Sequence, residues 1–483
     1  MRRLGVPGFV LFAVAAVAIP SAASPTAQPA PTSPAADRSG RTGNLIALVR
    51  SPQIMAPTGE AMREALLDVA HGRISAVLDR TGLSPVRSIA ELGAVAVRPA
   101  PGQSLARARH ELEADPAVRR VEPERYRTLR YLPDDPALVR HDTRAPSNDF
   151  YQWNLRQERF PKAWKRTHGR RAKLAIIDTG IDGRHFDLRG RLAYSKGYDY
   201  ADCGGPAEPE CTGARHDEVG HGTHVAGLAC GAGNNGAGVA GAAFKCKLVN
   251  EKAADTEKLD DSLIARSITN ATNHGADVIS MSFGGPGRSG LINQALNYAY
   301  HHDVVLVAAA SNRDTTHQGT PASHLQPNGT GDRLRSGKGL VVTAAGHNDR
   351  RAWFHPGRGT GISLAAYGSA SAACAIRSDC GIFSTFPSNS TTIETGDPIN
   401  GEPPCGNCRA TFQGSNDFAY LEGTSMATPQ VAGAAALIRG KRPGIDNDTV
   451  LRIIKRTASG HRFRNALGWG ILNAGRALKR AAR

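Results

Sequence analysis

The sequence predicts an α/β protein with a doubly wound, mainly parallel sheet, preceded by a small α+β domain with a ferredoxin-like order of elements. Short apolar runs recur after about residue 133, as strands buried on both faces of a parallel sheet require. Helical stretches lie between these runs, and this alternation favours right-handed βαβ units. The preceding block, residues 43–130, has a strand and helix pattern of its own.

The larger part is expected to contain four apolar strands with helices between them. The strands are Leu174–Ile177, Asp277–Met281, Val304–Ala308 and Leu340–Ala344, and the helices include Leu259–His274 and Gly290–His301. Residues 366–416 interrupt this rhythm with Ser, Thr, Gly, Pro and four cysteines. We therefore expect a surface insertion there that disulfides hold in place.

The block 43–130 reads as a separate unit with the order βαββαβ. We expect strands at 44–50, 72–77, 94–98 and 118–123, and helices at 61–71 and 105–114.

The start of the chain has the features of an export signal. The short basic start Met1-Arg2-Arg3 comes before the apolar stretch Val6–Ile19, and the small residues Ser21–Ala23 follow it. The stretch is short for a membrane span, so we expect a signal peptide at 1–23. Residues 24–42 are rich in Pro, Ala, Ser and Thr and are expected to form a linker. We therefore expect a secreted, extracellular protein without a membrane anchor.

Composition and charge exclude several other classes of protein. The chain has 483 residues and is 40% hydrophobic, which excludes both a disulfide-held miniprotein and a disordered chain. Lys and Arg number 59 against 43 Asp and Glu, for a formal charge of +16. These cations form no basic helix or run in the sequence of the kind that contacts nucleic acid, so we expect no nucleic-acid partner.

All eight cysteines follow residue 200, and an even number in an exported chain predicts disulfides. Eight cysteines allow 105 pairings, so the sequence leaves the connectivity open. Cys405 and Cys408 form a CxxC pair that a redox or zinc site could use, but no second CxxC or nearby His pair completes a zinc site.

Three short segments carry the residue types of nucleophilic catalysis. Asp178 stands where the strand Leu174–Ile177 ends at a glycine turn, the edge at which open α/β sheets form their sites. His221 lies between two glycines at the start of a small-residue helix. Ser425 follows a Gly-Thr turn and opens an Ala-rich helix that extends to about Ile438.

Each segment alone has a plainer interpretation. Asp178 could cap a turn, and Ser425 could be an ordinary helix N-cap. His221 and His224 could bind a metal, but no HExxH arrangement or nearby third ligand accompanies them, so a neutral imidazole acting as general base is favoured. A serine at a helix N-terminus also gains from the positive end of the helix dipole when its oxygen becomes anionic.

Together, the order Asp, His, Ser, with each residue in a glycine-framed motif, resembles the subtilisin family of serine peptidases. The likeness covers roughly residues 43–475. It implies a subtilisin-like fold and a serine endopeptidase that hydrolyses polypeptide substrates. Ser425 would be the nucleophile, His221 the general base, and Asp178 the group that orients the imidazole.

The resemblance also implies the surroundings of this triad. Asn312 matches the family's asparagine that binds the oxyanion, together with the N–H of Ser425. The substrate chain would add to a strand edge and enter a pocket. The implied substrate-binding residues are Ser282, Phe283, Gly284, Ala309 and Ala310. Ser311 and Gln430 depart from the family pattern and leave the substrate preference open.

A structural Ca²⁺ ion is implied as well. The loop 233–239 resembles the family's calcium loop, and Asp187 matches the carboxylate that completes it. Ca²⁺ takes carboxylate, amide and carbonyl oxygens. The implied ligands are Asp187, Gly233, Asn235, Ala237 and Val239, with Asp149 as a weak candidate for a ligand from the N-terminal segment. A plain Gly/Asn turn is the alternative.

The block 43–130 resembles the family's inhibitory propeptide, and 131–483 resembles the peptidase domain. We therefore expect an autoprocessed zymogen, with the chain's own propeptide as a partner, a maturation site between Arg130 and Asn148, and a monomer. The competing hypothesis is a catalytically silent, secreted binding protein on the same scaffold.

Overall fold

The computed structural model describes residues 41–50, 60–125, 132–145, 148–197, 211–212, 216–371, 380–397 and 403–483. The expected signal peptide, most of the expected linker, and the cysteines Cys203 and Cys374 lie outside these residues. The chain divides into two compact units, Met1–Arg130 and Tyr131–Arg483, which we describe separately. No helix among the described residues is long and apolar enough to cross a membrane.

The first unit is a four-stranded antiparallel sheet in the order β2-β3-β1-β4, with two helices. Its elements are β1 (Arg41–Val49), α1 (Glu60–Thr81), β2 (Ser84–Ile89), β3 (Ala94–Arg98), α2 (Leu105–Ala114) and β4 (Val118–Arg125). Residues from both helices and from strands β1, β3 and β4 form its core.

The strand expected at residues 72–77 is wrong, because this segment continues helix α1. Ala70, Ile74 and Val77 are buried and recur at the spacing of a helix face. The second strand is instead Ser84–Ile89, whose six residues are all exposed and show no apolar alternation.

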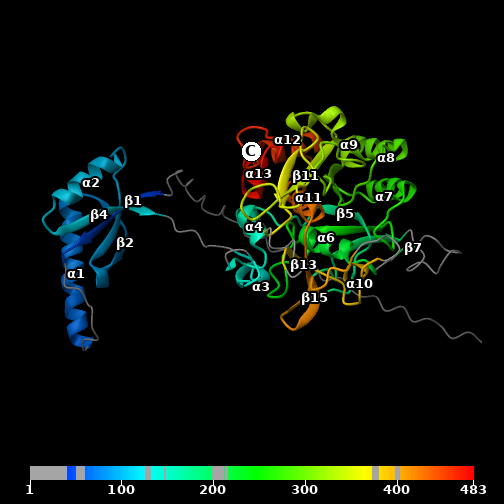
Figure 1. Cartoon of the computed structure of the whole chain (residues 1–483). Helices are drawn as coiled ribbons and strands as arrows, with labels where there is room; N and C mark the ends of the chain where they lie inside the picture. The colour runs from blue at the N-terminus through cyan, green and yellow to red at the C-terminus, as the bar shows by residue number, and fades with distance from the viewer. Residues whose placement is uncertain are drawn as a thin grey trace, which may run out of the picture. The chain divides into compact units, whose positions relative to one another are not determined.

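The second unit contains an eight-stranded sheet, drawn in Figure 1 with helices on both faces. Its strands, in spatial order, are β12 (Leu364–Tyr367), β11 (Gly339–Ala345), β10 (Val305–Ala309), β9 (Val278–Met281), β5 (Lys173–Asp178), β8 (Lys247–Lys252), β6 (Leu192–Gly197) and β7 (Cys211–Thr212). Seven strands are parallel, and β7 pairs antiparallel with β6. The predicted doubly wound α/β fold is confirmed.

Alternate residues of β5 belong to two different cores, as a sheet covered on both sides requires. Leu174 and Ile176 pack with the helices α6 (His221–Cys230), α11 (Thr424–Lys441), α12 (Asn447–Thr457) and α13 (Ala474–Ala481). Ala175 and Ile177 pack with α7 (Asp261–Asn273) and α8 (Gly290–His301) on the other face. The short helices are α3 (Pro136–Val139), α4 (Trp153–Gln157), α5 (Phe160–Trp164), α9 (Ala322–Leu325) and α10 (Thr392–Thr395).

The segment 366–416 is more than the surface insertion we expected. It contributes β13 (Ile382–Thr385) and β14 (Arg409–Phe412) to a three-stranded sheet completed by β15 (Ser415–Leu421). All four residues of β13 are buried, and Phe383 joins an aromatic core with Phe412 and Phe418. Strand β13 also packs on α6, so this part of the insertion supports the helix that begins at His221.

Two disulfides lie within the described residues, Cys230–Cys246 and Cys405–Cys408. The second one occupies both thiols of the CxxC pair, so this pair is not a zinc half-site here. The first joins the end of α6 to the turn before β8.

The Cys230–Cys246 disulfide is expected to contribute about 3 kcal/mol to the free energy of unfolding, because it closes a loop with a sequence separation of 16. Replacing both cysteines by Ala should lower that free energy accordingly in urea titrations. The matched control is the double Ala variant of Cys405 and Cys408, whose separation is 3 and whose expected loss is about 2 kcal/mol. A larger loss in the control would contradict this chain-entropy argument.

Candidate active site

Asp178 and His221 meet at the carboxyl edge of the parallel sheet. Asp178 is the last residue of β5, and His221 is the first residue of α6. The Nδ1 atom of His221 lies 2.8 Å from Oδ1 of Asp178. Asp178 is 3% exposed, so the carboxylate that faces the imidazole is almost fully withdrawn from water.

Two glycines allow the strand end and the helix start to approach this closely. A Cβ atom on Gly222 would lie 2.1 Å from the carbonyl oxygen of Gly180, a distance that no side chain tolerates. Gly180 itself has φ of 116°, a conformation that disfavours any residue with a side chain. The glycines that frame the motifs therefore have a direct steric role.

Asp217 holds this junction together, and our sequence analysis missed it. Its buried carboxylate accepts hydrogen bonds from the N–H groups of Gly220 and Thr223, both at 2.8 Å, and from Oγ1 of Thr179 at 2.9 Å. It thus ties the first turn of α6 to the residue after Asp178. The available signal was an aspartate just before a helix start, where a carboxylate is favourable.

The electrostatic surroundings raise the pKa of His221 above its usual value of 6.5. Burial alone would lower this pKa, but the charge and the hydrogen bond of Asp178 outweigh it, and the charges of Asp217 and Glu257 add to the rise. The imidazolium form is therefore stabilised, as a group that accepts a proton during a reaction requires.

Ser425 is the second residue of α11 and follows the N-cap Gly423. In this conformation its Oγ donates to the carbonyl oxygen of Ser282 at 2.8 Å, and Oγ of Ser282 donates to the carbonyl oxygen of Ser425 at 3.1 Å. The N–H groups in the first turn of a helix have no partner within the helix and carry its positive dipole end. The backbone at Ser425 is therefore suited to an anionic oxygen.

The side chain of Asn312 is fixed by the neighbouring helix start. Its Oδ1 accepts from the N–H of Thr424 at 3.0 Å and from Oγ1 of Thr424 at 2.8 Å. Because the acceptor atom is used in this way, the Nδ2 group of Asn312 remains as the donor. A carbonyl oxygen near Ser425 could be bound by that group.

The candidate catalytic and oxyanion-binding residues line one cleft of about 780 Å³. Asp178, His221, Asn312 and Ser425 are among its lining residues, and so is every expected substrate-binding residue: Ser282, Phe283, Gly284, Ala309 and Ala310. The cleft lies at the ends of the parallel strands β5, β9 and β10. Its lining also includes residues that sequence reasoning did not assign, among them Glu257, Leu259, Arg313, His317 and Ile393.

His224 has a structural position. Its Nε2 lies 3.0 Å from the carbonyl oxygen of Ile382 and 3.2 Å from that of Ala419, within the small sheet. Burial lowers the pKa of His224 to about 3, which keeps the ring neutral. The metal-binding alternative for the two histidines has no support from this geometry.

Comparison with known proteins identifies the family and the fold. The model of the subtilase family matches residues 169–470. The chain belongs to the subtilase family. Thermitase from Thermoactinomyces vulgaris is 31% identical to it over 66% of this chain and 88% of that protein. Subtilisin BL from Lederbergia lenta is 31% identical over 67% of this chain and 96% of its own length.

A solved protease structure from Pseudoalteromonas arctica aligns with this subtilase at a TM-score of 0.57 and 27% identity, over 72% of this chain and 99% of that one. The relatives are named proteases, so this subtilase is a subtilisin-like serine endopeptidase, a hydrolase. The predicted family and enzyme class are confirmed.

The loop expected to bind calcium lies against buried carboxylates. Asp187 accepts from the N–H of Val239 at 2.9 Å and from Nδ2 of Asn235 at 3.1 Å. Asp135, which sequence reasoning missed, accepts from the N–H of Asn234 at 2.8 Å. Burial raises the pKa of Asp187 to about 7 and that of Asp135 to about 6, although hydrogen bonds from the loop oppose the rise.

The oxygen atoms of this loop fit a cation such as Ca²⁺. The carbonyl oxygens of Gly233, Ala237 and Val239 accept no hydrogen bond from any described residue. The described part of the chain contains no cluster of three His, Cys, Asp or Glu that could hold a metal ion. A Ca²⁺ ion in this loop would therefore be bound mainly by backbone carbonyl and amide oxygens, with few charged side chains. Asp149 instead contacts His347, with Oδ2 at 3.3 Å from Nε2, and forms no hydrogen bond with the described loop residues 233–239.

Proposed function

We propose that this subtilase is a secreted endopeptidase, made as an autoprocessed zymogen, that cleaves peptide bonds through Asp178, His221 and Ser425. The observation that carries the proposal is the hydrogen bond of 2.8 Å between Asp178 and His221 in the cleft that Ser425 also lines. These residues do not support the competing hypothesis of a silent binding protein, because the residues required for catalysis are all present: Asp178, His221, Ser425 and Asn312.

In the proposed mechanism, Ser425 Oγ leaves its hydrogen bond to Ser282 and donates to Nε2 of His221. The oxygen attacks the scissile carbonyl while the imidazole takes its proton, and the imidazolium then protonates the leaving amine. Asp178 holds the ring through Nδ1 and stabilises its charge. Water hydrolyses the acyl-enzyme by the same steps in reverse order.

The negative oxygen of the tetrahedral intermediate needs donors that are already in place. We assign Nδ2 of Asn312 and the N–H of Ser425 to this role. Thr424 orients the amide of Asn312, so the donor is fixed before the substrate arrives. The substrate backbone would pair with Ser282–Gly284 as an added strand, and Ala309 and Ala310 would wall the pocket for its side chain.

Digestion of a peptide library by the purified protein, read by mass spectrometry, tests the proposed function. We expect cleavage at internal peptide bonds and complete loss of cleavage after treatment with a fluorophosphonate. The same data give the preference for the residue before the cut. A library that remains intact under conditions where the protein is folded would support the silent binding protein instead.

We further propose that residues 43–130 are the inhibitory propeptide, after a signal peptide at 1–23 and a linker at 24–42, and that 131–483 is the peptidase domain. The four-stranded sheet and two helices of the first unit support a self-contained template. Parallel sheets form slowly because their contacts are distant in sequence, so such a template would assist folding. We keep the expectations of a monomer and of no nucleic-acid partner.

The activity should rise with pH through a pKa above 6.5, because His221 must be neutral to accept the proton of Ser425 and its pKa is raised. Glu257→Gln should move this acid limb to lower pH by a few tenths of a pH unit, since it removes one charge that favours the imidazolium. The measurement is kcat/KM against pH. At about 1 M salt, where exposed charges are screened, this shift should nearly vanish. A shift of the profile to higher pH in Glu257→Gln would contradict the role of Glu257 in raising the pKa of His221.

A calcium ion would be held by Asp187, Asn235 and the carbonyl oxygens of Gly233, Ala237 and Val239, with Asp135 beside them. When bound, the ion would neutralise the buried carboxylates and stiffen the loop. We expect added Ca²⁺ to raise Tm, and Asp187→Asn to abolish this response. The matched control, Asp149→Asn, should keep it; an equal loss in both variants would rule out this loop as the site.

A further inference from the structure

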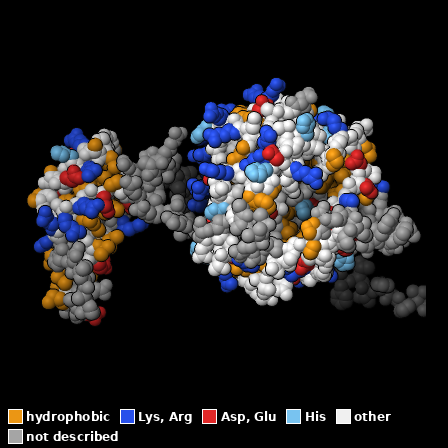
Figure 2. Space-filling model, viewed as in Figure 1, with side chains coloured by type: hydrophobic (Ala, Val, Ile, Leu, Met, Phe, Trp, Pro, Cys, Tyr) orange, Lys and Arg blue, Asp and Glu red, His pale blue; other side chains and the backbone are white. Residues whose placement is uncertain are grey.

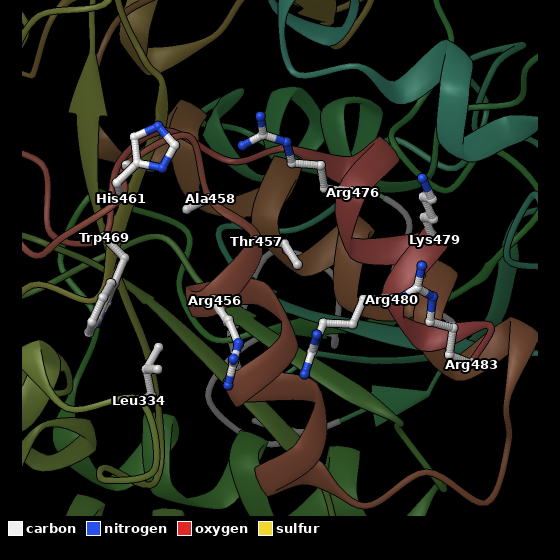
Figure 3. Close-up of a pocket in the computed structure, with 11 residues that line it drawn as sticks. Leu334, Arg456, Thr457, Ala458, His461, Trp469, Arg476, Lys479, Arg480 and Arg483 are labelled. Carbon is white, nitrogen blue, oxygen red and sulfur yellow. The ribbon is translucent and has the colours of Figure 1, made fainter. Parts of the chain in front are cut away.

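A second hollow of about 540 Å³ lies in the peptidase unit, and none of its lining residues belongs to the catalytic cleft. Its wall is formed by the end of α12, the following loop and α13 (Figure 3). The lining residues are Leu334, Arg456, Thr457, Ala458, Gly460, His461, Trp469, Arg476, Lys479, Arg480 and Arg483. Five of them are Arg or Lys and one is His, while none is Asp or Glu.

The cations of α13 occupy one face of the helix. Arg476, Lys479 and Arg480 are the exposed residues of α13, and all three are basic. Its alanines and Leu478 are buried in the main core, which fixes the orientation of the helix. Arg456 adds a further charge from the last turn of α12. In Figure 3, Arg456 and Arg480 point in the same direction from the two helices.

These charges are not neutralised by neighbouring side chains. None of the five cations forms an ion pair with a carboxylate in the part of the chain that the structure describes. Like charges three and four residues apart on a helix destabilise it. Arg476 also lies in the first turn of α13, where the helix dipole disfavours a cation. The helix dipoles favour Lys479 and Arg480 in the last turn of α13, and Arg456 in the last turn of α12. Helix stability therefore accounts for part of the cluster, but not for Arg476 or for Arg483, which lies beyond the end of α13.

The side chains of this cluster favour a ligand that carries several phosphate or sulfate groups. Four of the five cations are arginines, whose planar fork of N–H donors fits two oxygens of one phosphate or sulfate. The basic face of α13 spans about 6 Å along the axis from Arg476 to Arg480. Arg483 lies beyond the helix and Arg456 lies on α12, so a single small anion could not contact all five cations. The space-filling view in Figure 2 shows that Lys and Arg side chains gather on the side of this unit that carries α12 and α13.

We propose that this hollow is an exosite that binds a linear polymer of phosphate or sulfate groups without nucleobases, such as inorganic polyphosphate or a sulfated oligosaccharide. Such a ligand would lie along Arg476, Lys479, Arg480 and Arg483, with Arg456 on the facing helix. The site would hold the enzyme on a polyanionic polymer while the catalytic cleft remains open to polypeptides. The proposal does not depend on the catalytic assignment, because the two sets of lining residues are separate.

The test is fluorescence anisotropy of labelled inorganic polyphosphate and of a labelled sulfated oligosaccharide, titrated with the full chain at 50 mM salt. The double variant Arg476→Ala, Arg480→Ala should weaken binding of the tighter probe about 100-fold, at about tenfold for each charged hydrogen-bonding group. The control Arg189→Ala, Arg350→Ala removes the same charge from exposed positions outside the hollow and should weaken binding less than threefold. Hydrolysis of a short neutral peptide should be unchanged in both variants, which shows that they are folded.

The relative affinities of the two probes identify which polymer is preferred, and binding of either one supports the proposal. Three results would overturn it. No binding of either probe at 50 mM salt would mean that the cations form an ordinary solvated surface. An equal loss in the control variant would mean diffuse attraction to the net charge. Binding of poly-glutamate as tightly as both probes would assign the hollow to acidic polypeptides.

Discussion

Replacing Ser425 by Ala is expected to lower kcat about 10⁶-fold, a loss of about 8 kcal/mol in transition-state stabilisation. Without Oγ no acyl-enzyme forms, and the residual rate comes from binding and oxyanion stabilisation alone, as known for subtilisins. The variant precursor should also remain uncut when it is made in a protease-free host. Both results are measured on one preparation, by peptide hydrolysis and by intact mass.

Ser289→Ala is the matched control, because Ser289 also stands at a helix start. Its Oγ accepts from the N–H of Ile292 at 3.3 Å and thus acts as an N-cap of α8, outside the cleft. The control should lose about 1 kcal/mol of stability and keep its activity. A fully processed Ser425→Ala protein would contradict autoprocessing, and unchanged kcat would remove Ser425 from the mechanism.

Replacing Asp178 by Asn should lower kcat about 10⁴-fold with little change in the fold. The carboxylate accepts a hydrogen bond from Nδ1 of His221 at 2.8 Å, which leaves Nε2 as the atom that takes the proton. An amide at this position can donate to Nδ1 and stabilise the wrong tautomer. It also removes the charge that raises the pKa of His221, so the remaining activity should have its acid limb at lower pH.

Asp182→Asn separates this effect from the general loss of a buried carboxylate. Asp182 is 1% exposed and lies in the loop that follows Asp178, but it contacts Arg184 rather than the imidazole. We expect kcat within a few-fold of the parent and an unmoved acid limb. If both variants lost activity equally, the loop as a whole would matter rather than the contact between Asp178 and His221.

Much of the peptidase unit could be predicted from the sequence because its parallel strands are buried on both faces. The apolar runs at β5, β9, β10 and β11 mark strands for this reason. Strand β8 was missed, since four of the six residues in its sequence Lys-Leu-Val-Asn-Glu-Lys are charged or polar. Its Lys252 is fully buried and pairs with Glu218 and Asp255, partners that only the tertiary structure reveals.

The candidate site was predicted where a short motif holds the reacting group, and missed where a partner comes from elsewhere. Asp178, His221 and Ser425 each stand in a glycine-framed segment that is visible in the sequence. Asp135 contacts the loop at Asn234 from 99 residues away, and no local sequence pattern distinguishes this buried aspartate from the exposed ones. The basic hollow was missed although four of its five Arg and Lys residues lie within residues 476–483. The expectation that the cations form no basic helix is therefore wrong for α13, and only Arg456 joins the cluster through packing.

The most direct test of the central claim is the location of a fluorophosphonate adduct by peptide mapping. If Ser425 is the nucleophile activated by His221, the adduct should form on Ser425 alone, and His221→Ala should slow its formation by several orders of magnitude. An adduct on another serine, or labelling of Ser425 at the same rate in His221→Ala, would contradict the account.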